Sequence, residues 1–146
     1  MAKDETKKMA ALAIFLRVYG ILSLIIFGSL LVGFAFQTPL LAEGGPLNWT
    51  IWDDVTGHVG PMLFVVYLVW GVFFFLAVRK PLAYVSFLNF TMWANLFHGL
   101  LMAVQAAMMM DRYWSKWFTD IPFVLILALG IYLWRLTASQ DRSASH

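Results

Sequence analysis

The sequence predicts an all-α fold, a transmembrane four-helix bundle with both termini on the cytoplasmic side. Of its 146 residues, 62% are hydrophobic and only 12% are charged, whereas a soluble domain averages about 45–50% apolar and about 25% charged residues. A soluble domain of this length has too much surface to bury so much apolar material. The apolar residues also fall into long segments, separated by charged or glycine-containing connections. The chain is therefore expected to lie in a lipid bilayer.

Four segments approach the length that crosses a membrane, which is about 20 apolar residues for a core of about 30 Å. Within one transmembrane domain, residues 1–146, we expect helices over about 9–36, 59–78, 81–110 and 120–138. Asp120 marks the start of the last helix as a capping carboxylate. This segment is the shortest, and it spans the membrane only if the helix continues to about Ala138.

The connections between the segments differ in length. The Arg79-Lys80-Pro81 hairpin is so short that the second and third helices should be antiparallel neighbours. The outer loop, residues 37–58, is long, and its part 48–54 is expected to form a short interfacial helix. Trp49 and Trp52 would then face lipid, as is typical of helices that lie in the membrane interface.

The basic residues are distributed unevenly between the two sides of the predicted bundle. Seven of them lie in the two terminal tails and the Arg79-Lys80 hairpin, whereas the other two loops carry only Arg112 and Lys116. Because cytoplasmic loops are enriched in Lys and Arg, both termini should be cytoplasmic. The basic residues form no long run or aromatic-interleaved patch, so nucleic acid is not an expected partner.

The third segment carries a polar stripe, which is its most informative pattern. Successive members are separated by three or four residues, so they share one face of a helix. They are Thr91, Asn95, His98, Met102, Gln105 and Met109. Gly99 and Ala103 run beside the stripe and would let another helix approach closely. We expect the stripe to face the protein interior, either as hydrogen-bonded packing between helices or as the lining of a site.

Two histidines suggest an alternative with a bound metal or haem. His58 and His98 are expected at similar depth on adjacent helices, and Asp54 would lie one turn before His58 if that helix extended back far enough. Imidazole and carboxylate suit zinc, copper or iron, and two histidines can ligate haem. No cofactor is favoured by the sequence as a whole, and the absence of cysteine excludes thiolate ligands and thiolate nucleophiles.

The overall plan, with the segment Asn95-Leu96-Phe97-His98-Gly99-Leu100-Leu101-Met102-Ala103-Val104-Gln105-Ala106, resembles small four-helix bacterial membrane proteins of the BphX-like group and related families of unknown function. The resemblance implies a bacterial inner-membrane protein with about four helices and no established activity.

Because the sequence shows no catalytic constellation, we expect a non-enzymatic accessory or interaction subunit of a membrane complex or a homo-oligomer. The first alternative is a binder or permeation pathway for a small hydrophobic molecule, lined by the polar stripe. The second is a redox component that holds a metal or haem through His58 and His98.

Overall fold

The computed structural model describes residues 2–52 and 54–143, and it describes side chains for 6–52, 54–81 and 83–134. The described chain is all-α, without a strand. Its α-helices are α1 (Ala2–Ala35), α2 (Val59–Arg79), α3 (Val85–Met108), α4 (Met110–Tyr113) and α5 (Asp120–Ser143). Short 3-10 helices connect them: η1 (Asn48–Thr50), η2 (Pro81–Tyr84) and η3 (Trp114–Trp117).

Three of these helices are long and apolar enough to cross a membrane by length and composition: α1 over Thr6–Ala35, α2 and α3. A fourth span is obtained if Met110–Trp117 and Asp120–Trp134, which meet at a bend of 41°, are counted together. The expectation of a multi-pass membrane protein is therefore confirmed. Helix α5 itself continues beyond Ala138 to Ser143, as the fourth predicted span requires.

The third predicted helix, 81–110, is wrong at both ends. Residues Pro81–Tyr84 form a 3-10 turn instead, in which the Ala83 N–H donates to the carbonyl of Lys80 at 2.9 Å. At the other end, Met109 leaves helical geometry with φ −130° and ψ 50°. The chain then turns through α4 and η3 before α5 begins, so the regular helix is limited to Val85–Met108.

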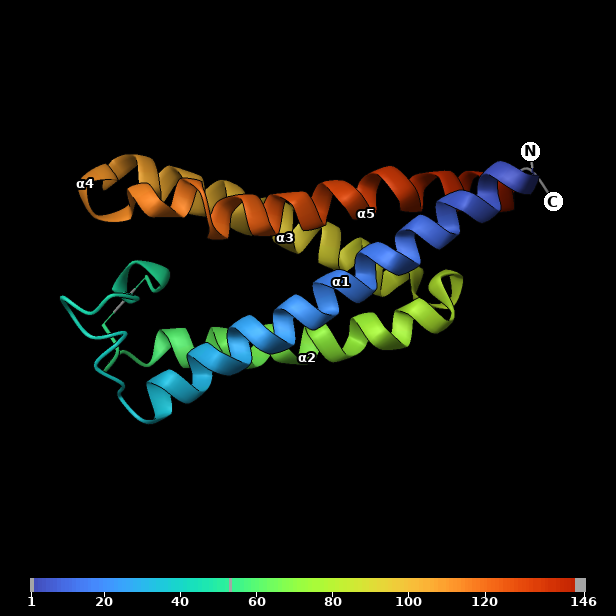
Figure 1. The fold of residues 1–146 in the computed structure, drawn as a ribbon. Coiled ribbons are helices and arrows are strands. Elements are labelled where there is room, and N and C mark those ends of the chain that lie inside the picture. Colours follow the sequence, from blue (N-terminus) through green and yellow to red (C-terminus); the bar gives the residue numbers. More distant parts are fainter. Residues whose placement is uncertain (1, 53, 144–146) are drawn as a thin grey trace.

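The long helices are arranged as two pairs (Figure 1). Helix α1 packs along α2, and α3 packs along α5, while α1 also crosses α5. The start of α1, the end of α5 and the α2–α3 hairpin lie toward one end of the molecule. The loop between α1 and α2 and the α4–η3 turn lie at the other end. We call these the hairpin end and the loop end.

Small residues allow the backbones within each pair to approach closely. A Cβ atom added to Gly71 of α2 would lie 3.2 Å from the carbonyl oxygen of Gly20 in α1. A Cβ atom on Gly99 of α3 would lie 2.6 Å from Leu125 Cδ2 in α5. The predicted role of Gly99 as a close-approach site is thereby confirmed.

Helices α2 and α3 are neighbours across their hairpin, but mainly through aromatic side chains. The ring centroids of Trp70 and Phe90 are 5.9 Å apart, and those of Phe73 and Phe87 are 5.5 Å apart. Rings of this size separate the two backbones. The pairing expected from the short hairpin is therefore present, while the tightest backbone contacts are α1 with α2 and α3 with α5.

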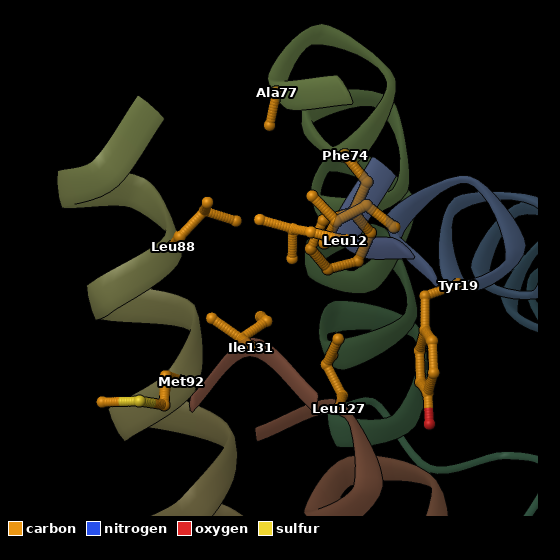
Figure 2. Packing of buried hydrophobic residues seen from close by; sticks show 9 residues of the cluster. Leu12, Tyr19, Phe74, Ala77, Leu88, Met92, Leu127 and Ile131 are labelled. Carbon is orange, nitrogen blue, oxygen red and sulfur yellow. The ribbon is translucent and has the colours of Figure 1, made fainter. Parts of the chain in front are cut away.

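An apolar cluster at the hairpin end joins all four long helices (Figure 2). The side chains converge from α1, α2, α3 and α5, and we call them the hairpin-end cluster. Its buried members are Leu12, Leu16, Tyr19, Phe74, Ala77, Leu88, Met92, Leu127 and Ile131. This cluster fixes the two helix pairs against each other at one end, which leaves the loop end to be closed by other contacts.

Candidate functional site

Two residues of the predicted polar stripe form a hydrogen-bonded group in the interior. Thr91 and Asn95 are both 0% exposed. Tyr67 of α2 donates its hydroxyl proton to Asn95 Oδ1 at 3.1 Å, and Asn95 Nδ2 donates to the Thr91 carbonyl at 2.9 Å. Trp70 Nε1 donates to Thr91 Oγ1 at 2.9 Å. The polar atoms therefore pair across the α2–α3 contact, as transmembrane packing groups do.

The other members of the stripe are buried to different degrees. Met102 is buried and His98 is half-buried, whereas Gln105 is exposed. At 100° per residue, His98 and Gln105 lie about 60–80° to one side of Asn95, whereas the buried Gly99 lies about 40° to the other side. The prediction that the whole stripe faces inward is therefore wrong for Gln105 and for Met109. Gln105 is exposed because α5 packs on the Gly99 side of α3, and Met109, which is 47% exposed, lies beyond the end of α3.

His98 lies beside Tyr67 and under the influence of a distant carboxylate. The ring centroids of His98 and Tyr67 are 6.4 Å apart. The carboxylate of Asp120, at the start of α5, interacts electrostatically with the Tyr67 hydroxyl and with the His98 imidazole.

The predicted metal ligands do not form one cluster. His58 is exposed and precedes α2, which begins at Val59. Asp54 lies in a turn, where its Oδ1 accepts the Thr56 N–H at 3.1 Å, so the helix does not extend back to Asp54, as the metal site would have required. Within the part of the chain that the structure describes, no three His, Asp or Glu side chains are placed to hold a metal ion.

The most concentrated polar arrangement is at the loop end, around a buried lysine. Lys116 of η3 is 1% exposed. Its Nζ lies 3.0 Å from Asp120 Oδ2 and donates to the Trp49 carbonyl at 3.1 Å. Burying an ammonium group is costly unless it is paired and hydrogen-bonded, and these two partners meet that requirement.

Trp52 completes the arrangement from the loop between α1 and α2. Its Nε1 donates to Asp120 Oδ2 at 2.7 Å, and its carbonyl accepts the Tyr113 hydroxyl at 2.9 Å. Lys116 Nζ lies 5.4 Å from the Trp52 ring centroid, in the range of cation–π attraction. Ser115 Oγ donates to the Trp49 carbonyl at 3.2 Å. We call this group the clasp: Trp49, Trp52, Tyr113, Ser115, Lys116 and Asp120.

The clasp corrects two predictions. The first is that Trp52 faces lipid, because its indole is directed at Asp120 instead. The second is the interfacial helix over residues 48–54, of which the described residues form only the 3-10 turn Asn48–Thr50. Asp120 is the first residue of α5, and its carboxylate binds Lys116 and Trp52. Burial lowers the pKa of the Lys116 ammonium, and the Asp120 carboxylate opposes that shift.

One signal for the clasp was present in the sequence. Lys116 and Asp120 are four residues apart, a spacing that allows an ion pair on one helix face. The sequence nevertheless indicated a loop position for Lys116 and a helix-capping role for Asp120. The Trp52 contribution carries no local signal, since Trp52 and Asp120 are 68 residues apart.

These features define a multi-pass α-helical membrane protein. Residues 8–145 match a family described as a family of unknown function, DUF6632, and the chain belongs to that family. No curated protein and no solved structure matches the chain. The narrower resemblance to the BphX-like group stays a prediction.

Proposed function

We propose that this chain is a non-enzymatic subunit of the bacterial inner membrane, built as a single four-helix transmembrane domain with both termini cytoplasmic. It acts by packing against other membrane proteins or further copies of itself. The observation that carries the proposal is the position of Gln105, an amide on a lipid-exposed face of a predicted span.

Gln105 lies on α3 between apolar side chains that are themselves exposed. Leu101 is 56% exposed, Val104 55% and Met108 80%. Among the described residues, no hydrogen bond to the Gln105 side chain is found. An amide that faces hydrocarbon without a partner is unfavourable, whereas a hydrogen bond from a neighbouring helix satisfies it. A second helix against this face would supply that bond.

The hydrogen-bonded group around Thr91 and Asn95, farther along α3, supports the same proposal. Tyr67, Trp70, Thr91 and Asn95 satisfy one another, so their polar atoms are engaged in packing. This favours a packing role over the lining of a ligand path. The charge asymmetry of the sequence supports the orientation, since the hairpin end carries most of the basic residues.

The test is the size of the particle that contains this chain in mild detergent, measured by native mass spectrometry after purification from its own membrane. We expect an assembly larger than the monomer, and Gln105→Leu should shift it toward the monomer. Val104→Leu, a neutral change on the same face, is the matched control. A monomeric wild-type chain would overturn the proposal, as would an assembly that Gln105→Leu leaves intact.

A further inference from the structure

The loop between α1 and α2 is anchored on the first helix pair. Its buried residues Leu41, Ile51 and Val55 pack with Phe34 of α1 and Phe64 of α2. The loop is therefore part of the α1–α2 half of the molecule. Any contact from this loop to the α3–α5 half joins two separately packed units.

The polar contacts between these two units at the loop end are concentrated in the clasp. From the loop side only the Trp49 carbonyl, the Trp52 carbonyl and the Trp52 indole take part in the bonds described above. The neighbouring polar groups of the loop bond within the loop itself: Asn48 to the Leu41 carbonyl, and Thr50 to the Leu47 carbonyl. A contact that depends on two residues can be lost without disturbing the rest of the loop.

A further apolar cluster packs against the clasp, and we call it the loop-end cluster. It consists of Tyr67, Met102, Ala106, Ile121 and Val124. The rings of Trp52 and Tyr113 pack against it and lie 4.7 Å apart, centroid to centroid. Tyr67 is also the donor to Asn95. Trp52 therefore packs against the same cluster whose Tyr67 bonds to the buried Asn95.

We propose that the clasp is a releasable closure that controls access from the loop end to the interior between the two helix pairs. In the closed state Lys116 is held by Asp120 and Trp49. In the open state the loop moves away from η3 and α5, which withdraws Trp52 from the loop-end cluster and admits water-borne solutes toward Met102. The hairpin-end cluster keeps the two pairs together during this motion.

The charge pair makes the closure sensitive to the loss of a single partner. Removing one partner of a buried ion pair leaves an uncompensated charge, whereas removing both leaves none. An open state returns Lys116 to water. Asp120→Asn should therefore favour the open state, because the amide oxygen still accepts the Trp52 N–H while the negative charge next to Lys116 is lost.

Because the chain contains no cysteine, a single introduced cysteine reports access without background. Met102→Cys places a thiol in the loop-end cluster, and its reaction with a membrane-impermeant methanethiosulfonate reagent is timed on the full chain in detergent. We expect labelling to be faster by at least about tenfold when Lys116→Met or Asp120→Asn is added. Lys80→Met, an exposed lysine at the hairpin end, is the matched control and should leave the rate unchanged.

Two further variants keep the experiment decisive if Lys116→Met folds poorly. In the double variant Lys116→Met with Asp120→Asn, labelling should be slower than with Asp120→Asn alone. A thiol at Ser23→Cys, where the wild-type residue is 1% exposed at the α1–α2 contact, should label at one rate in all backgrounds. Unchanged labelling of Met102→Cys would overturn the proposal, and so would an equal acceleration at Ser23→Cys, which indicates general loosening.

Discussion

The two ends of the molecule are closed by different interactions. At the hairpin end, buried apolar side chains from all four long helices meet in one cluster. At the loop end, a smaller apolar cluster is supplemented by a few directional bonds around Lys116 and Asp120, which join the loop to the α3–α5 pair. The first kind of closure sums many weak contacts, whereas the second depends on each of a few partners. A single substitution should therefore act globally at one end and locally at the other.

The difference also reflects the solvent at each position. Within a bilayer, lipid tails are as apolar as the side chains, so helices associate through close packing rather than through removal of apolar surface from water. The clasp lies in the connections between spans, where polar groups compete with water. Its strength comes from burial of the ion pair together with its hydrogen bonds.

The largest effect is expected for Phe74→Ala, in the middle of the hairpin-end cluster. Phe74 is 0% exposed, and such a truncation costs about 3–5 kcal/mol, since the cavity left behind relaxes only in part. We expect a lower unfolding free energy and faster hydrogen exchange in all four long helices. Phe97→Ala, a residue that is 64% exposed on α3, should have little effect. Equal effects of the two variants would contradict the proposed role of this cluster.

A smaller effect is expected for Gly99→Ala, at the contact of α3 with α5. The new methyl group would lie 2.6 Å from Leu125 Cδ2 and 2.9 Å from Val124 Cγ2, so both side chains must move. Overpacking of this kind costs about 1–3 kcal/mol, and the measurement is unfolding of the purified chain in a titration with denaturing detergent. The matched control is Gly28→Ala, where the nearest atom of Leu68 is 3.8 Å away. Stability that falls equally in both would remove the argument for close packing at Gly99.

The smallest effect is expected for Trp52→Phe at the loop end. The variant keeps an aromatic ring on the loop-end cluster but loses the 2.7 Å bond to Asp120 Oδ2. The net loss is small because water replaces this bond at a carboxylate that is 32% exposed. Hydrogen exchange should accelerate in residues 36–52 and stay unchanged around Phe74. Exchange that accelerates equally at both ends would contradict the separation between them. Trp49→Phe is the control, because its indole bonds only within the loop.

Local sequence predicts the spans of this protein better than the ends of its helices. The spans follow from the length and apolarity of their segments, because a helix in lipid must satisfy its own backbone. Helix ends were less predictable. The 3-10 turn at Pro81 and the break at Met109 occur inside one uncharged segment, which gives no change of composition to mark them.

The polar stripe was predictable as a periodicity but not as a set of contacts. Thr91 and Asn95 are buried as expected, whereas Gln105 is exposed. A stripe with an arc of about 80° is wide enough for one edge to face inward and the other outward. Which edge is buried depends on where α5 packs, and Gly99 settles that by admitting Leu125.

The sequence by itself predicted a membrane protein with four spans, where those spans lie and which of them carries polar groups, and the structure supports three to four spans. These are properties of segments, and the bilayer acts on each segment separately. Only the tertiary structure decided that Lys116 is buried and that Trp52 reaches Asp120. A lysine and a tryptophan in loops are normally assigned to water and to the membrane interface. Burial of the charge becomes acceptable only when partners distant in sequence are brought within hydrogen-bond distance.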